Sequence, residues 1–242
     1  MDHLSPIGIA GQVALMRRLD TVANNVANAE TAGFRAEGVT FSSVVSKTRP
    51  FDTSFLGAGR SHVDPRSGNF VKTGNQLDVA INGSAFMAVL TGRGIAYTRD
   101  GRMQMLPSGE LVSLLGHPVL DPSGAPISLD PLGGEVEISR DGFIRQGGRS
   151  PGSIGLFDVD FSQGYSRDEN SGLIPVAAAQ PLEDFLESGF VQGYSEGSNV
   201  NPITEITRLI ELQRIFEAVN ASLEQRDGSL RETIQALGAR SA

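Results

Sequence analysis

The strongest constraint on how this chain can fold is a long helical pattern close to its C-terminus. Nine positions alternate there at spacings of four and three residues: Leu209, Gln213, Phe216, Asn220, Leu223, Asp227, Leu230, Ile234 and Leu237. Asn201 and Pro202 fit a helix cap and a first turn, and Gly238 fits the end of the helix. Such a helix extends about 55 Å, so it cannot lie along a compact domain over its whole length. Its apolar stripe therefore requires a further partner.

A second, shorter helical pattern lies near the N-terminus. Ser5 and Pro6 fit its cap and first turn, and Gly33 fits its end. Its seam residues follow one another at spacings of four, three and four: Leu15, Leu19, Val22 and Val26. This spacing is typical of a coiled coil, so we predict that the two terminal helices pair with each other and with neighbouring chains. Polar seam residues such as Gln213 weaken a coiled coil but can fix its register.

Between the two helical patterns the sequence changes to a β pattern. From Leu77 to Phe161, short apolar runs alternate with turn sequences about every 8–12 residues, which is typical of an antiparallel β-domain. The dipeptide Asn82-Gly83 predicts a hairpin between the strands on either side of it. Glycine accounts for 29 of the 242 residues, which suits a fold with many tight turns.

Two stretches of the chain have weak periodicity. Residues 35–76 predict an extended connector with local strands, in which residues 51–60 form an exposed loop, and residues 162–185 predict further loops. The fold class predicted overall is α+β, mainly β, with an antiparallel β-domain flanked by N- and C-terminal coiled-coil-like helices. The predicted domains are an N-terminal helix at 1–34, the connector at 35–76, a β-rich domain at 77–192 and a C-terminal signature and helix at 193–242.

Composition and residue spacing argue against catalysis and against several kinds of partner. Cysteine is absent, and His3, His62 and His117 are scattered without the spacing of metal ligands. The sequence contains neither a phosphate-binding loop nor a nucleophile elbow. A net charge of −8 disfavours nucleic acid, and the absence of a run of 18 apolar residues disfavours membrane insertion. We therefore predict a protein that is not an enzyme and that has no catalytic residue, cofactor or metal.

Four aspartates could suggest paired catalytic carboxylates. Asp100, Asp121 and Asp141 lie in turn sequences, where an aspartate usually accepts hydrogen bonds from its own backbone. Asp78 lies in a strand with apolar neighbours. We predict that Asp78 is a buried, hydrogen-bonded carboxylate with a structural role.

Three segments of the chain resemble the signatures of bacterial flagellar rod and hook proteins. They comprise residues 23–28 with 31–35, residues 77–83 with Phe86 and 97–101, and residues 193–201 with Gln213, Arg214 and Glu217. The segments occur in the family's order, although residues 84–87 and Gly197 depart from its common pattern. Within these segments the signature residues are Gly33, Phe34, Asp78, Asn82, Gly83, Gly101, Ser198, Asn199 and Val200.

The resemblance implies a structural subunit of the flagellar basal-body rod in the periplasm, which transmits motor torque. It implies export by the flagellar type III apparatus without a cleaved signal peptide, and assembly with copies of itself and with other rod proteins. The residues expected to polymerise are Leu15, Leu19, Val22, Asn25, Val26, Asn28, Leu209, Gln213, Arg214, Phe216, Glu217, Leu223, Leu230 and Ile234.

The resemblance is greater to proximal-rod members of the family than to distal-rod members, which are the alternative. It rests here on the chain length and on residues 33–37. Two other classes stay open as alternatives. A periplasmic carbohydrate-binding or hydrolytic domain would need a cleft with convergent polar groups, and a cytosolic scaffold would have no link to motility.

Overall fold

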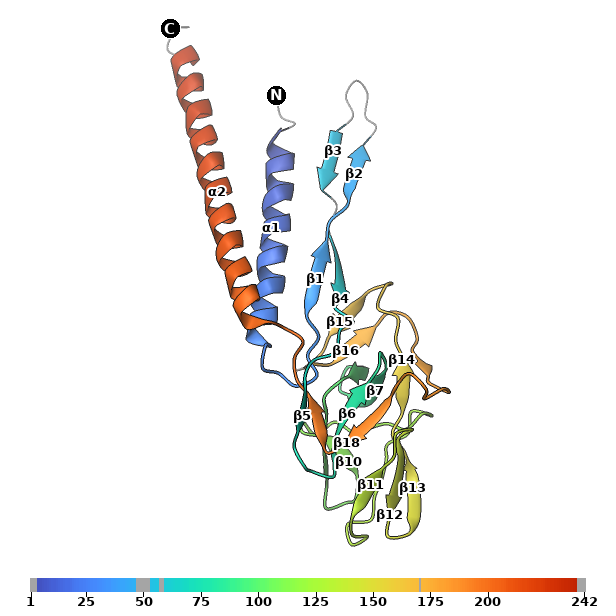
Figure 1. The fold of residues 1–242 in the computed structure, drawn as a ribbon. Helices are drawn as coiled ribbons and strands as arrows, with labels where there is room; N and C mark the ends of the chain where they lie inside the picture. Colours follow the sequence, from blue (N-terminus) through green and yellow to red (C-terminus); the bar gives the residue numbers. More distant parts are fainter. Residues whose placement is uncertain (1–3, 47–52, 57–58, 170, 239–242) are drawn as a thin grey trace. The chain divides into compact units, whose positions relative to one another are not determined.

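The computed structural model describes residues 4–46, 53–56, 59–169 and 171–238. The first element along the chain is helix α1 (Leu4–Ala27), and the last is helix α2 (Pro202–Gly238) (Figure 1). The strands between them are β1 Glu37–Thr40, β2 Ser43–Ser46, β3 Thr53–Leu56, β4 Arg60–Val63, β5 Phe70–Lys72, β6 Asp78–Asn82, β7 Phe86–Thr91, β8 Gly94–Thr98, β9 Gly101–Met105, β10 Leu111–Ser113, β11 Val136–Ile138, β12 Phe143–Gln146, β13 Arg149–Ser153, β14 Leu156–Asp158, β15 Tyr165–Arg167, β16 Leu173–Pro175, β17 Gln180–Pro181, β18 Gly189–Gln192 and β19 Tyr194–Glu196.

The chain forms two compact units. One unit contains α1, the β2–β3 hairpin and α2, and the other contains residues 27–37 and 62–201. The α+β class and the antiparallel sheets predicted from the sequence are confirmed. In the part of the chain that the structure describes, neither helix is apolar enough over a sufficient length to span a membrane.

Three antiparallel sheets make up most of the larger unit. The largest has six strands in the order β15-β16-β8-β7-β14-β17, and the next has four in the order β10-β9-β6-β18. A three-stranded sheet has the order β11-β12-β13, and β5 pairs with β19. The turns at Gly92-Arg93 and Asp141-Gly142 close hairpins, as their sequences predict, because β7 pairs with β8 and β11 pairs with β12.

The alternation of side chains along β7 divides the core into two hydrophobic clusters. Met87 and Val89 belong to the larger cluster, together with buried residues of β6, β9, β10, β11, β12 and β14. Phe86 and Ala88 belong to the smaller cluster, in which aromatic rings meet edge to face. Since successive side chains of a strand point to opposite faces, one strand supplies both clusters.

The hairpin predicted at Asn82-Gly83 is wrong, although a turn is present there. Strand β6 pairs with β9 and β18, whereas β7 pairs with β8 and β14, so this turn carries the chain from one sheet to another. Gly83 has a φ of 94°, and a Cβ at this position would lie 2.2 Å from the Ser188 Oγ. The turn dipeptide therefore requires a reversal of the chain but does not decide which strands pair.

The weakly periodic stretches contain more strands than the sequence predicts. Residues 53–56, predicted as loop, form β3 and pair with β2. Residues 162–185, also predicted as loop, contain β15, β16 and β17. These strands are two to four residues long, which is too short for a period of two to be recognised.

In the helical unit, two side-chain hydrogen bonds connect α1 and α2 and define an antiparallel register. The Gln12 Nε2 donates to the Asn220 Oδ1 at 2.6 Å, and the Asn25 Nδ2 donates to the Glu205 Oε2 at 3.2 Å. As the residue number rises along α1, it falls along α2. This register sets the predicted N-terminal seam opposite the stretch of α2 between Glu205 and Asn220, which includes Phe216.

The first prediction concerns the larger cluster of the core. Leu111 of β10 is fully buried there, so Leu111→Ala is expected to lower the free energy of unfolding by about 2–5 kcal/mol in a urea titration followed by circular dichroism. Leu132, which is 95% exposed, provides the matched control, and Leu132→Ala is expected to change stability by less than about 0.5 kcal/mol. Equal losses in the two variants would contradict this description of the core.

Candidate functional site

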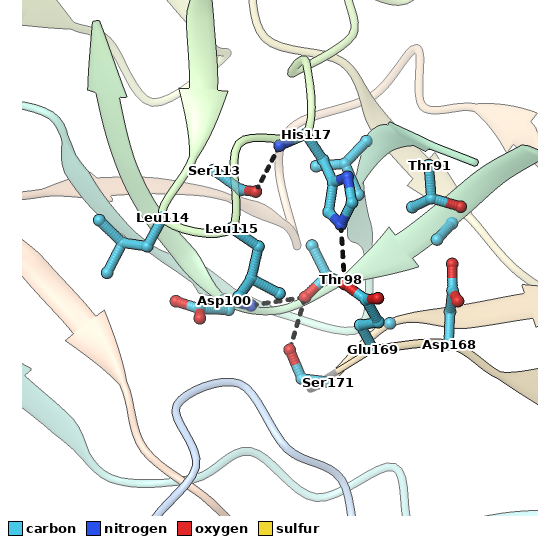
Figure 2. A pocket seen from close by; sticks show the side chains of 13 residues that line it. Thr91, Thr98, Asp100, Ser113, Leu114, Leu115, His117, Asp168, Glu169 and Ser171 are labelled. Atoms are coloured by element: carbon cyan, nitrogen blue, oxygen red, sulfur yellow. Dashed lines mark hydrogen bonds and ion pairs between the residues drawn. The ribbon is translucent and has the colours of Figure 1, made fainter. Parts of the chain in front are cut away.

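The described residues include one hollow with polar side chains, lined in part by His117, Glu169 and Ser171 (Figure 2). The His117 Nε2 lies 3.3 Å from the Glu169 Oε2, whereas the hydroxyls of Thr98 and Ser171 bond to each other at 2.7 Å. These two hydroxyls are therefore engaged with each other, and the imidazole Nε2 faces a carboxylate, which is not the pairing of a nucleophile with its base. Among the described residues, no group of three or more His, Asp or Glu side chains could hold a metal ion.

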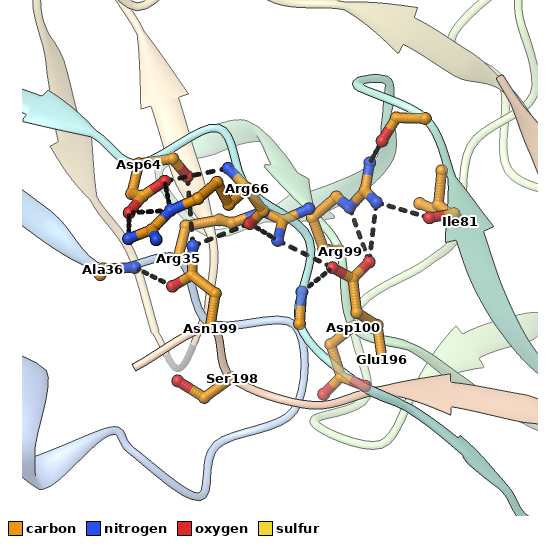
Figure 3. A network of polar contacts seen from close by, with 12 residues as sticks. Arg35, Ala36, Asp64, Arg66, Ile81, Arg99, Asp100, Glu196, Ser198 and Asn199 are labelled. Atoms are coloured by element: carbon orange, nitrogen blue, oxygen red, sulfur yellow. Dashed lines mark hydrogen bonds and ion pairs between the residues drawn. The ribbon is translucent and has the colours of Figure 1, made fainter. Parts of the chain in front are cut away.

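A buried ionic cluster is the more informative site, and Glu196 is at its centre (Figure 3). The Glu196 carboxylate is fully buried at the end of β19. Its Oε1 forms an ion pair with the Arg35 Nη1 at 2.8 Å and accepts a hydrogen bond from the Gly68 amide at 3.0 Å. Its Oε2 lies 2.8 Å from both the Nε and the Nη2 of Arg99. The carboxylate is thus paired and hydrogen-bonded on both oxygens, as a buried charge requires.

Arg99, which follows β8, uses its other donors on the backbone near Gly83. The Nη1 donates to the carbonyls of Gly83 and Ala85, and the Nη2 donates to the carbonyl of Ile81. These carbonyls flank the turn between β6 and β7, so the guanidinium satisfies acceptors that a β6–β7 hairpin would pair with amides. Burial lowers the pKa of Arg99 to about 10, which leaves the side chain charged at neutral pH.

Arg35 introduces a second buried guanidinium beside the same carboxylate. Its side chain is 2% exposed, and its Nη1 also donates to the carbonyl of Arg66. Its Nε and Nη2 are buried without a hydrogen-bond partner, and burial lowers the pKa of Arg35. Two cations therefore share the one carboxylate of Glu196, and loss of that carboxylate would remove a buried counterion from both of them.

Gly33 brings the N-terminal signature against the cluster. Its amide donates to the Glu196 carbonyl at 2.8 Å, and its φ is 68°. A Cβ at this position would lie 2.1 Å from the amide nitrogen of Asp100. The close approach and the left-handed backbone together explain why glycine is needed here.

Asn199, in the C-terminal signature, forms hydrogen bonds with residues 34–36 and 64–66. Its Oδ1 accepts the Ala36 amide at 2.7 Å, and its Nδ2 donates to the Arg66 carbonyl at 2.8 Å. Its own amide donates to the Phe34 carbonyl at 3.3 Å. The fully buried Phe34 ring lies under the Arg167 guanidinium, 4.4 Å from its centre. All three signature segments therefore converge on Glu196 and its neighbours.

The remaining signature residues have structural positions. Asp78 is buried and accepts a hydrogen bond from the Asn75 Nδ2 at 2.9 Å, which confirms the prediction of a buried, hydrogen-bonded carboxylate. Ser198 accepts the Val200 amide at 3.2 Å, Asn82 is exposed at the end of β6, and a Cβ on Gly101 would lie 2.1 Å from the Val79 carbonyl oxygen. The turn aspartates behave as predicted, because the amides of Ser123, Phe143 and Arg102 each donate to an aspartate two residues earlier.

The residues predicted to polymerise differ in exposure within the chain. Val22 and Asn25 are buried, whereas Leu15, Leu19, Val26, Asn28, Leu209, Phe216 and Leu223 are partly buried. Gln213, Arg214 and Glu217 are exposed, so Gln213 does not take the seam position expected from the alternating spacing. Leu212 and Val219 have the partly buried positions instead. The side chains of Leu230 and Ile234 lie outside the described residues.

Arg35, Arg99 and Glu196 lie within the signature segments, but the sequence alone assigns them no role. A charged residue in a strand or turn ordinarily lies at the surface, so each one alone predicts a solvated side chain. The available signal was weak: three charges in segments otherwise rich in glycine and apolar residues. Only their partners identify them as a buried cluster.

Comparisons with known protein families match the same three regions. Residues 7–35 match the family "Flagella basal body rod protein", residues 80–146 match "Flagellar hook protein FlgE/F/G D1 domain", and residues 191–236 match "Flagellar basal body rod FlgEFG protein C-terminal". The chain belongs to the flagellar basal-body rod family, whose members are structural subunits of the rod.

Within this family the chain is similar to proteins named FlgF. It is 46% identical to the flagellar basal-body rod protein FlgF of Mesorhizobium japonicum, over 97% of this chain and 98% of that protein. It is 41% identical to FlgF of Rhizobium meliloti, over 96% of each chain. It is also 30% identical to the rod protein FlgG of Bacillus subtilis, over 94% of this chain and 96% of that protein.

The second prediction tests the ionic cluster. Glu196→Gln keeps the shape of the side chain but leaves Arg35 and Arg99 without their buried counterion, so the free energy of unfolding is expected to fall by about 3–5 kcal/mol. The measurement is urea unfolding of the full chain at neutral pH. The exposed Glu187 provides the control, and Glu187→Gln is expected to stay within about 0.5 kcal/mol of the parent. A loss below about 1 kcal/mol in Glu196→Gln would contradict the role assigned to Glu196.

Proposed function

We propose that this chain is a non-enzymatic subunit of the periplasmic flagellar rod and polymerises through α1 and α2 with copies of itself and with other rod proteins. Its position in the proximal rod is favoured by the two FlgF proteins at 46% and 41% identity, against 30% for the FlgG protein of Bacillus subtilis. It passes through the flagellar export apparatus, and it transmits motor torque. The distal rod is the second candidate position.

The exposed apolar face of α2 carries this proposal. Ile203, Ile206 and Ile210 follow at spacings of three and four residues and are 77%, 45% and 46% exposed. Gln213 and Glu217 continue the same spacing, so the stripe lies on a different face of α2 from the partly buried seam. Each buried isoleucine contributes roughly 1.5–3 kcal/mol, which gives a neighbouring chain a strong reason to cover this face.

The same logic applies to α1, which has apolar side chains on more than one face. Ala14 and Val22 are buried, whereas Val13 and Met16 are 49% and 53% exposed. A helix that packs against only one partner ordinarily has one apolar stripe, with polar residues on its other faces. Two partners for each helix, one within the chain and one from another subunit, account for both sets of residues.

The Glu196 cluster supports the transmission of torque. Residues 33–36 follow α1 closely in sequence and residues 196–199 precede α2 closely, and both segments are fixed to the same buried cluster. A force applied at the root of either helix would therefore reach the β-sheets through many short hydrogen bonds. Flexible linkers at these positions would absorb the rotation instead.

The third prediction tests the seam of α2. Phe216→Asp introduces a charge at a partly buried seam position, so rod assembly and swimming are expected to be lost while the larger unit stays folded. The measurements are motility in soft agar and recovery of this chain in purified basal bodies. Ser123→Asp adds the same charge at an exposed turn and is expected to leave motility unchanged. Normal swimming by Phe216→Asp would refute the role of the seam.

The fourth prediction concerns the chain before assembly. In a dilute monomer, amide hydrogens of α2 are expected to exchange orders of magnitude faster than those of β6, β7 and β8, because one partner helix provides little support for so long a helix. Hydrogen exchange followed by mass spectrometry measures the difference. If the amide hydrogens of α2 exchanged as slowly as those of the central strands, α2 would be stable within one chain and would not need a neighbouring chain.

A further inference from the structure

The hollow shown in Figure 2 lies beside residues that the rod function does not use. Its walls combine apolar groups with a few polar ones, and Leu114 and Leu115 at its edge are 50% and 52% exposed. Sites for small ligands commonly have this composition, in which apolar walls hold the body of the ligand and a few polar groups orient it.

Asp168 is the unusual residue of this hollow. Its side chain is only 7% exposed, and its Oδ1 lies 3.5 Å from the Arg93 Nη1. Its Oδ2 is buried without a hydrogen-bond partner. A hydrogen bond from the Thr91 side chain is the main cause that holds the pKa of Asp168 below its usual value, so the carboxylate is charged at neutral pH. A buried, charged acceptor with an unused oxygen is costly unless something donates to it.

The charges around the hollow favour a cation. Asp100, Asp168 and Glu169 line it, and no lysine or arginine does. Arg102 pairs with Asp100, Arg93 pairs with the Asp168 Oδ1, and His117 faces Glu169. The Asp168 Oδ2 is the acceptor left without a partner, and three carboxylates beside two arginines favour a cation over an anion.

We propose that this hollow binds the end of an aliphatic primary ammonium, the chemistry of a lysine side chain. The methylene stem lies against Leu114 and Leu115, and the ammonium donates to the Asp168 Oδ2. An ammonium is compact and can donate to a single oxygen, whereas a planar guanidinium binds best to a pair of acceptor oxygens, and Asp168 has one left. A divalent cation would need several carboxylates around one point, and the described residues do not provide such a group.

The test uses n-butylammonium as the probe and the full-length chain as the protein. Amide resonances of Thr91, Leu115, His117, Asp168 and Gly172 are expected to shift in an NMR titration and to saturate with one common dissociation constant. Butan-1-ol has the same stem without the charge, and tetramethylammonium has the charge without donors. Each of these is expected to bind at least about tenfold more weakly, because the hydrogen bond to a charged acceptor is missing.

A matched pair of variants links the binding to Asp168. Asp168→Asn keeps the shape of the side chain and removes its charge, so the dissociation constant for n-butylammonium is expected to rise by about tenfold or more. Asp158→Asn changes an exposed aspartate and is expected to bind like the parent. Saturation by all three probes alike, no saturation by n-butylammonium, or unchanged binding by Asp168→Asn would each overturn the proposal. If Asp168→Asn does not fold, the comparison of the three probes on the parent chain still tests whether the hollow prefers a primary ammonium.

Discussion

The structure of the larger unit depends on how one buried carboxylate is satisfied. Glu196 receives its donors from Arg35, Arg99 and the Gly68 amide, which belong to three separate parts of the chain. A carboxylate buried without these donors would be strongly unfavourable, and so would either arginine without the carboxylate. The segments that carry them therefore have to arrive together. This interdependence fixes the residues after α1 and the residues before α2 to one cluster.

The same cluster lies where the chain passes from one sheet to another. Arg99 donates to carbonyls on both sides of the turn at Gly83, where a hairpin would have used backbone amides. Strands β6 and β7 belong to different sheets, and β7 supplies side chains to both hydrophobic clusters. A side chain distant in sequence thus satisfies backbone carbonyls at a turn whose local sequence favours a hairpin.

The helical unit has the opposite character, because its polar contacts are few and its apolar surface is incompletely covered. Hydrogen bonds from Gln12 and Asn25 set the register of α1 against α2, and a row of isoleucines stays exposed elsewhere on α2. The larger unit has its buried charges paired, whereas the helices have apolar side chains that stay exposed. This combination suits a protein of the flagellar rod family, whose members are assembled into a larger structure. The larger unit is therefore stabilised by contacts within the chain, whereas the helices have apolar surface left that a neighbouring chain can bury.

The two helices, the antiparallel β character and the hydrogen bonds of the turn aspartates could be predicted from the amino-acid sequence, because each depends on local periodicity or on turn chemistry. The family could be predicted as well, since the three signature segments can be recognised in order. The folded chain was needed to show that Asn82-Gly83 joins two sheets, that Leu212 rather than Gln213 takes a partly buried position, and that Glu196 meets Arg99 across 97 residues of sequence. Contacts of this kind leave no local pattern, because a charged residue looks the same in a sequence whether its partner is water or a buried counterion.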